Sequence, residues 1–335
     1  MDAKLEDGKM TKTQAVSFSR TGGPEVFDYV EIDLPPPPAG EVQIRQAAVG
    51  LNFIDVYFRN GSYKVPHLPF VTGKEGAGTV TAVGPDVTDF KVGDRVAYAS
   101  ADGAYSVERN IEARHLVHVP GGIELETAAA MMLKGMTAEY LLNRTFKVGP
   151  ETVLLFHAAA GGVGLIAGQW AKALGATVIG TAGSEDKVAL ALEHGYDHVI
   201  NYKSEDFVGR VRDITGGKGV DVVYDSIGRD TFPQSLDCLK PRGLFASFGQ
   251  SSGPIENFSL SQLAQKGSLF ATRPTLFTYI AARQELIDSA KALFDVVQSN
   301  KVRINVNQTY PLREVGRAHA DLESRKTTGT TLLIP

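Results

Sequence analysis

The pattern of apolar and polar positions along the chain changes near residue 133. Before that point, apolar segments are short and separated by turn residues such as Gly84-Pro85 and Gly93-Asp94. Two of these segments, 78–83 and 95–99, have the composition of β-strands. We therefore expect the first part of the chain to be rich in strands.

Beyond residue 133, apolar runs alternate with segments of helical pattern. Strands that alternate with helices predict a parallel sheet covered by helices on both faces. The tail is mixed. We expect strands at 153–157, 177–181, 199–200, 220–225, 244–248, 304–310 and 331–334, and helices at 164–174, from Ser184 toward Gly195, and at 207–214, 231–239, 280–298 and 312–323.

One charge-free stretch invites another interpretation. Residues 152–171 form a run of 20 positions without a formal charge, which is long enough for a membrane span. Three glycines interrupt its middle, at Gly161, Gly162 and Gly164. A buried strand, a tight turn and a helix explain the run better.

The segment Ala159-Ala160-Gly161-Gly162-Val163-Gly164 joins the first strand of this region to its first helix. A dinucleotide-binding turn has this place in a fold: Gly161 lets the backbone approach the pyrophosphate, and Gly164 lets the helix pack on the strand. The amide groups and the dipole of the helix N-terminus favour phosphate. Because Ala159 replaces the first glycine of the usual pattern, a purely structural strand–helix turn is the alternative.

The end of the next strand suggests which dinucleotide binds. NAD-binding proteins carry an acidic residue about 20 positions after the glycine turn, but here the count reaches 181–183, where no carboxylate stands. Lys187 follows within reach of a 2′-phosphate, so the pattern favours NADPH. Lys187 could instead be a solvated helix lysine, and Glu185 and Asp186 could favour the helix N-terminus or repel the phosphate.

Composition narrows the class of protein. A length of 335 residues predicts two domains, and the net charge of −4 gives no strong field for nucleic acid or an anionic membrane. No basic strip interleaved with aromatic residues stands out for RNA. The single cysteine, Cys238, excludes an internal disulfide and any multi-cysteine metal site. Residues 1–13 lack the apolar core of a secretory signal, so we expect a cytoplasmic protein.

Long phrases between about residue 14 and residue 335 resemble the quinone oxidoreductases of the zinc-independent medium-chain dehydrogenase/reductase superfamily, the group of NADPH:quinone reductase and zeta-crystallin. These phrases are Leu51-Asn52-Phe53-Ile54-Asp55, Phe156-His157-Ala158-Ala159-Ala160-Gly161-Gly162-Val163-Gly164, Trp170-Ala171-Lys172-Ala173-Leu174-Gly175-Ala176, Val223-Tyr224-Asp225-Ser226, Ser247-Phe248-Gly249 and Glu323-Ser324-Arg325.

The resemblance implies an α/β architecture in which a doubly wound Rossmann sheet is combined with a GroES-like β-barrel domain. It places the GroES-like catalytic domain at 1–132 and 273–335 and the NADPH-binding domain at 133–272. A homodimer is usual in the family. It also implies cofactor contacts at Asn52, Phe53 and Tyr57 (nicotinamide end), at Gly162 and Val163 (pyrophosphate), at Ser184, Lys187, Tyr202 and Arg325 (adenosine phosphate), and at Ser226, Phe248, Gly249 and Ser251 (nicotinamide side). The glycine turn and the end of the next strand add Gly161, Gly164 and Gly183 as expected cofactor-binding residues.

The resemblance also bears on metal. Zinc-dependent relatives place a cysteine where Asn52 stands and a histidine where Lys74 stands, and neither residue is a plausible zinc ligand. We therefore expect no metal. Lys74 also departs from the quinone reductases, in which a small polar residue is usual.

The expected reaction is hydride transfer from NADPH to a quinone or a similar conjugated carbonyl, which requires a planar slot more than acid catalysis. Tyr57 and Tyr63 are the candidate catalytic residues, as walls of that slot and hydrogen-bond donors to an oxygen. Structural aromatic roles are the alternative. The competing functions are an NADPH-dependent alkenal or enone reductase and a crystallin-like or RNA-binding protein that only holds the cofactor.

Overall fold

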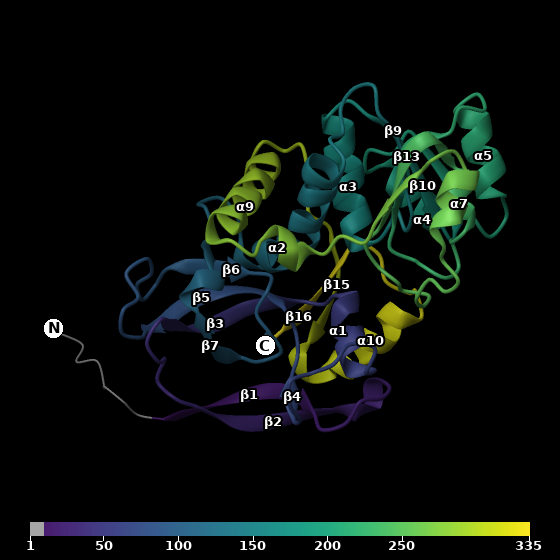
Figure 1. Cartoon of the computed structure of the whole chain (residues 1–335). Coiled ribbons are helices and arrows are strands. Elements are labelled where there is room, and N and C mark those ends of the chain that lie inside the picture. Colours follow the sequence, from purple (N-terminus) through teal and green to yellow (C-terminus); the bar gives the residue numbers. More distant parts are fainter. Residues whose placement is uncertain (1–9) are drawn as a thin grey trace. The chain divides into compact units, whose positions relative to one another are not determined.

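The computed structural model describes residues 10–335, which divide into two compact units (Figure 1). Unit 1 contains the described residues up to Leu133 together with Val306–Pro335, and unit 2 is Lys134–Asn305. Most of the N-terminal segment that lacks a secretory pattern lies outside the described residues. In the described part of the chain, no helix is long and apolar enough to cross a membrane.

Unit 2 is built on a six-stranded parallel sheet with the order β11-β10-β9-β12-β13-β14. Counted from β9, this order is 3-2-1-4-5-6, that of the Rossmann fold. The chain direction across the sheet reverses between β9 and β12. The strands are β9 (Val153–Phe156), β10 (Thr177–Ala182), β11 (His198–Asn201), β12 (Val220–Asp225), β13 (Leu239–Ser247) and β14 (Phe270–Thr272).

The first helices of unit 2 pack on this sheet. Their first turns follow local capping chemistry: Ser184 accepts a hydrogen bond from the Lys187 amide, and Asp206 accepts from the amides of Val208 and Gly209. Leu155, Ile179 and Val223 pack in one apolar cluster between sheet and helices. The helices are α3 (Gly162–Ala173), α4 (Glu185–Leu192), α5 (Phe207–Ile214), α6 (Gln234–Asp237), α7 (Leu260–Gln265), α8 (Leu276–Tyr279) and α9 (Arg283–Gln298).

Two expected helices are shorter than their patterns suggested. The helix expected over 231–239 is only α6, because the Thr231 hydroxyl donates to Asp225 and Leu239 already pairs with Val220 in the sheet. The helix expected over 280–298 begins at Arg283. The charge-free run 152–171 is the strand β9, the glycine turn and most of α3.

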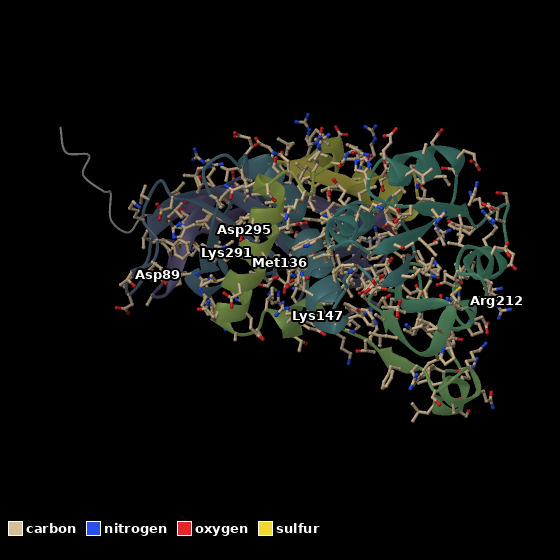
Figure 2. All side chains as sticks on the ribbon, turned by 90° about the horizontal axis from the view of Figure 1, so that it is seen from above. Asp89, Met136, Lys147, Arg212, Lys291 and Asp295 are labelled. Atoms are coloured by element: carbon tan, nitrogen blue, oxygen red, sulfur yellow. The ribbon has the colours of Figure 1, made fainter. Side chains whose placement is uncertain are left out.

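The second domain boundary was expected at 272/273, but unit 2 continues to Asn305. The reason is the packing of α9 on α2 (Leu125–Tyr140), the helix that crosses residue 133. A Cβ on Gly135 would lie 2.4 Å from the Leu293 side chain, and the Ser289 hydroxyl donates to Glu139 at 2.8 Å. The opposite face of α9 is solvated and carries the Lys291–Asp295 ion pair, labelled in Figure 2.

Unit 1 contains two sheets. The three-stranded sheet has the order β2-β1-β4, and the larger sheet has the order β15-β16-β3-β5-β6-β8, with β7 paired to β3. The C-terminal strand joins the larger sheet, since Leu333 pairs with Val49. The strands are β1 (Thr11–Phe18), β2 (Phe27–Leu34), β3 (Glu41–Gly50), β4 (Phe70–Val71), β5 (Glu75–Val83), β6 (Arg95–Tyr98), β7 (Glu108–Glu112), β8 (Val117–His118), β15 (Val306–Pro311) and β16 (Thr330–Ile334).

Two helices of unit 1 matter for the site. Helix α1 (Phe53–Arg59) follows β3, and α10 (Val315–Glu323) precedes β16. The two lie side by side in Figure 1, and Arg59 of α1 donates to Glu323 of α10 at 2.8 Å. The first unit thus brings the sequence near residue 55 next to the sequence near residue 320.

Candidate functional site

The glycine turn lies at the carboxyl end of β9, where the strand order reverses. A Cβ on Gly164 would lie 2.4 Å from the Ala158 carbonyl oxygen and 2.5 Å from that of Ala159, so only glycine allows α3 to approach so closely. Gly161 is the N-cap, and no side chain of the described residues caps this helix. Its first amides therefore suit an anion, and the turn fits the pyrophosphate of a dinucleotide.

The residues expected around the adenosine phosphate in unit 2 gather at the ends of β10 and β11. A Cβ on Gly183 would lie 2.5 Å from the Tyr202 hydroxyl, so the absence of a side chain there makes room for the tyrosine. The Ser184 hydroxyl accepts from the Lys187 amide at 3.4 Å. The Glu185 carboxylate accepts from Asn201 Nδ2 at 2.5 Å. Of the two acidic residues that could repel a phosphate, one is thus held by the end of β11.

The residues expected on the nicotinamide side also gather, at the ends of β12 and β13. A Cβ on Gly249 would lie 2.7 Å from the Ser226 carbonyl oxygen, and that oxygen accepts from the Ser251 amide at 3.0 Å. The Phe248 ring packs 5.5 Å from that of Phe156, the last residue of β9. These close approaches need a small residue at 249.

A buried hydrogen-bond network that sequence reasoning did not find ties three strand ends together. His157 Nδ1 lies 2.9 Å from Thr181 Oγ1, and His157 Nε2 lies 3.0 Å from Ser235 Oγ, which donates to Asp225. Each ring nitrogen of His157 thus has one hydroxyl group as its hydrogen-bond partner. Burial lowers the pKa of His157, and Asp225 opposes this shift. The neutral imidazole therefore braces β9, β10 and β12.

In unit 1, two buried carboxylates hold Asn52, which precedes α1. Its amide N–H donates to Asp55 Oδ2 at 2.9 Å, and its Nδ2 donates to Glu75 Oε2 at 2.8 Å. The other oxygen of Glu75 accepts from the Leu133 amide at 2.8 Å. A Cβ on Gly50 would collide with the Glu75 carboxyl, so the residue before Leu51 must be small. The orientation of Asn52 is therefore determined from both its backbone and its side chain.

The candidate aromatic residues form one cluster beside Asn52. Ring centroids are 6.0 Å apart for Phe53 and Tyr57, 5.2 Å for Tyr57 and Tyr63, and 5.7 Å for Phe58 and Tyr63. The Tyr63 amide donates to the Tyr57 carbonyl at 2.9 Å. The structure thus places next to each other the two tyrosines that the sequence analysis named as walls of one slot.

A second buried network joins α1 to α10. Arg59, which is 1% exposed, forms two hydrogen bonds of 2.8 Å with the Glu323 carboxylate and approaches His319 Nδ1 at 3.2 Å. His319 Nε2 lies 2.9 Å from the Tyr105 hydroxyl, which donates to Asp55 at 3.0 Å. One branch of the network therefore runs from Arg59 through His319 and Tyr105 to Asp55, the residue that holds the Asn52 amide.

This direction requires a neutral His319. Its Nδ1 accepts from Arg59 and its Nε2 donates to Tyr105. Burial first, and Arg59 second, lower the pKa of His319 well below its ordinary value. Arg325, expected at the adenosine phosphate, is exposed two residues beyond Glu323 and has a left-handed backbone with φ of 61°. The network therefore also anchors the end of α10 that carries Arg325.

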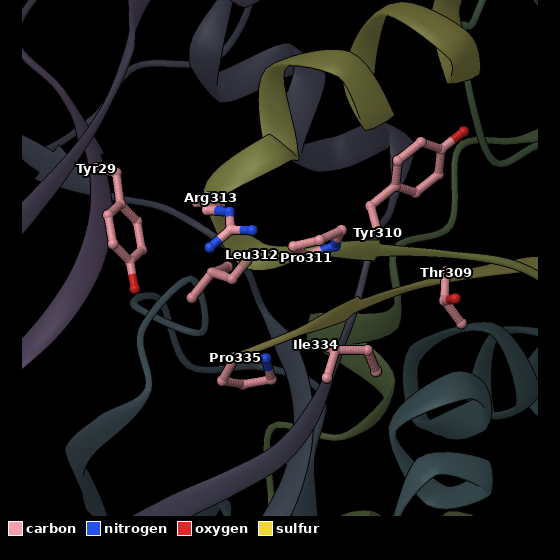
Figure 3. Close-up of a pocket in the computed structure, with 8 residues that line it drawn as sticks. All are labelled: Tyr29, Thr309, Tyr310, Pro311, Leu312, Arg313, Ile334 and Pro335. Carbon is pink, nitrogen blue, oxygen red and sulfur yellow. The ribbon is translucent and has the colours of Figure 1, made fainter.

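Neither a metal centre nor the surface pocket of unit 1 coincides with the predicted site among the described residues. Among residues 10–335, no three or more His, Cys, Asp or Glu side chains cluster as metal ligands would. A surface pocket of about 350 Å³ lies in unit 1 (Figure 3), and none of its lining residues belongs to the predicted site. That pocket is lined by Tyr29, Thr309, Tyr310, Pro311, Leu312, Arg313, Ile334 and Pro335.

Comparisons with known proteins agree with this geometry. Residues 38–150 match the family model of the alcohol dehydrogenase GroES-like domain, and residues 162–291 match that of zinc-binding dehydrogenases. The chain is 50% identical to a quinone oxidoreductase of Pseudomonas aeruginosa, over 96% of this chain and 99% of the relative. It is 46% identical to a 2-haloacrylate reductase of a Burkholderia species, over 96% and 98% of the two chains.

The crystal structure of Escherichia coli quinone oxidoreductase in complex with NADPH matches with a TM-score of 0.94 and 51% identity, over 96% of this chain and all of the other. The similarity thus extends through both units and confirms the expected combination of a Rossmann sheet with a GroES-like domain. The chain belongs to the quinone oxidoreductase family of medium-chain dehydrogenases/reductases.

Proposed function

We propose that the chain binds NADPH and reduces a quinone with it. The observation that carries this proposal is the match over 96% of the chain to a quinone oxidoreductase that was crystallised with NADPH. The local geometry of unit 2 supports the same conclusion, because an uncapped helix begins where the strand order of the sheet reverses.

Unit 2 takes the role of the NADPH-binding domain. The first amides of α3, from Gly162 to Gly164, bind the pyrophosphate. Lys187, Tyr202 and Ser184 bind the 2′-phosphate. Asn201 holds the Glu185 carboxylate at the end of β11. Ser226, Phe248, Gly249 and Ser251 border the nicotinamide side.

Unit 1 takes the catalytic role. When bound, NADPH supplies a hydride, and a proton from water completes the reduction of the quinone to the hydroquinone. Asn52, Phe53 and Tyr57 contact the nicotinamide end. Tyr57 and Tyr63 orient the planar acceptor and donate hydrogen bonds to its oxygen. This contribution is proximity and orientation, which suits an acceptor that needs little acid catalysis.

A second candidate function is the reduction of a carbon–carbon double bond conjugated with a carbonyl, and the 46% identity to a 2-haloacrylate reductase favours it. A panel of quinones, enals and acrylates, with NADPH oxidation followed by absorbance, separates the two. Faster turnover of quinones than of every alkene supports the first. Turnover of alkenes alone would contradict it, and no turnover with tight NADPH binding would indicate a cofactor-binding protein without this activity.

We further propose a cytoplasmic homodimer. The single cysteine is buried, which suits a reducing compartment. Strand β14 is an edge of the six-stranded sheet, and Phe270 on it is 62% exposed. An exposed apolar edge strand favours pairing with a second copy. Sedimentation should therefore give a dimer, and Phe270→Asp should shift it toward monomer; a wild-type monomer would contradict the proposal.

A further inference from the structure

Lys74 is a buried charge that the proposed function does not yet use. It lies just before β5 and is 7% exposed, although lysine is rarely buried without a partner. Its Nζ lies 2.6 Å from Asp102 Oδ1. The two side chains differ in exposure, with 8% for Lys74 and 40% for Asp102. The cation of this ion pair is therefore buried, whereas its carboxylate is exposed to solvent.

The surroundings of the ammonium are those of the candidate acceptor site in unit 1. Its Nζ lies 5.0 Å from the centroid of the Phe58 ring, and that ring packs on Tyr63. On its other side, the next residue in the chain is Glu75, which accepts the side-chain hydrogen bond of Asn52. Lys74 thus lies between β5 and α1, the two elements that orient Asn52 and carry the aromatic cluster.

We propose that Lys74 is a specificity-determining residue that receives a carboxylate of the hydride acceptor. The chain then prefers conjugated acceptors that carry a carboxylate over neutral acceptors of the same shape. This inference rests on the proposed function, because it names the substrate class of the same site.

Asp102 shows the contact that such an acceptor would make. Its carboxylate oxygen occupies a position 2.6 Å from the ammonium, a charge-assisted hydrogen-bond distance. The carboxylate of an incoming acceptor can replace that of Asp102 and keep the buried ammonium neutralised. A neutral acceptor has no charged group that could take the place of Asp102. Asp102 is thus the ion-pair partner of Lys74 and competes with the acceptor for its ammonium.

Competition gives the two residues opposite effects. Removing the charge at Lys74 removes the preference for acceptors that carry a carboxylate. Removing the charge at Asp102 frees the Lys74 ammonium to pair with the acceptor and strengthens that preference. A merely structural ion pair would behave differently, because both substitutions would then weaken the protein without changing the ratio between acceptors.

The experiment compares a benzoquinone that bears a carboxylate substituent with the methyl ester of the same quinone. The ratio of their kcat/KM values is measured for the wild type, Lys74→Gln, Lys74→Arg and Asp102→Asn. Lys91→Gln is the matched control, because Lys91 forms a 2.9 Å ion pair with Asp94 in the same unit but is 84% exposed. Circular dichroism and urea unfolding report whether each variant is folded.

The ratio should fall about tenfold or more in Lys74→Gln, stay within about threefold of wild type in Lys74→Arg, and rise in Asp102→Asn. Lys91→Gln should not change it. If Lys74→Gln does not fold, the ratio in Asp102→Asn still tests the proposal, because it should rise above the wild-type ratio. Equal ratios in all variants, with both quinones reduced, would overturn the role of Lys74 and leave the proposed function intact. Reduction of neither quinone would overturn both.

Discussion

The two units build their parts of the site in different ways. Unit 2 offers backbone and small residues: the close contacts at Gly164, Gly183 and Gly249 leave room where a Cβ would collide. Unit 1 offers side chains held by buried charges, with Asn52 bound to two carboxylates and Arg59 paired with Glu323. The Gly164 contact is local, and those of Gly183 and Gly249 join residues 19 and 23 positions apart, whereas the Arg59–Glu323 pair joins residues 264 positions apart.

The difference extends to the two buried histidines. His157 braces adjacent strand ends of unit 2 through hydroxyl groups. His319 lies in a charged chain of unit 1 and joins residues 260 positions apart. Both are neutral, but only His319 faces a guanidinium. Stability of unit 1 should therefore be more sensitive to single charge changes, and binding in unit 2 more sensitive to added volume.

The largest expected effect is on stability, in unit 1. Glu323→Gln leaves the Arg59 guanidinium buried without a carboxylate, which should lower the free energy of unfolding by about 3 kcal/mol. Glu314→Gln is the control, because Glu314 pairs at 3.2 Å with Arg317, whose side chain is 69% exposed; it should cost less than about 1 kcal/mol. Urea unfolding measures both. Equal losses of unfolding free energy would mean that the burial of Arg59 does not strengthen the contribution of its pair with Glu323.

The next effect is on binding, in unit 2. Gly164→Val places a branched side chain against the carbonyls of Ala158 and Ala159, so NADPH affinity should fall by about 100-fold or more, equivalent to about 2.7 kcal/mol. Gly161→Val should act in the same direction. Gly149→Ala is the control, because no other described atom lies within 4 Å of its added Cβ. Calorimetric titration of folded variants tests this, and normal binding by Gly164→Val would show that the turn is misassigned.

The third effect is a pH dependence shared by the units. Because burial lowers the pKa of His157 and His319 in the folded chain, the unfolded chain takes up these protons first as the pH falls below about 6.5. Stability should be constant above that pH and decrease below it, by at most about 1.4 kcal/mol per pH unit for each histidine. Urea unfolding between pH 7.5 and about 5 measures the slope, which should be smaller in His319→Gln. A stability that rises on acidification would contradict both assignments.

The smallest expected effect is cofactor choice in unit 2. NADPH should be preferred over NADH by about tenfold or more in kcat/KM, since a charged hydrogen bond to phosphate contributes about 1.5–3 kcal/mol. Lys187→Ala should remove most of this preference by weakening NADPH and sparing NADH. Lys291→Ala, in an exposed pair on α9, is the control. An alanine variant that keeps the full preference would make Lys187 a solvated helix lysine.

Local sequence predicted unit 2 well. The helix at Phe207–Ile214 and the strand at Val220–Asp225 have the expected bounds, and Ser184 is the expected N-cap. The errors occur where a tertiary contact overrides the local pattern. Helix α6 is shorter because Thr231 bonds to Asp225, and the boundary expected at 272/273 differs because α9 packs on α2.

The sequence by itself determined the strand–helix alternation, the glycine turn and the absence of a carboxylate at 181–183, because each depends on residues within a few positions of one another. Only the tertiary structure decided that Glu185 is held by Asn201 and that Lys74 pairs with Asp102. Likewise, nothing near Arg59 in the sequence indicates Glu323. A hydrogen bond or an ion pair requires its two groups within about 3 to 4 Å, and for distant residues only folding sets that distance.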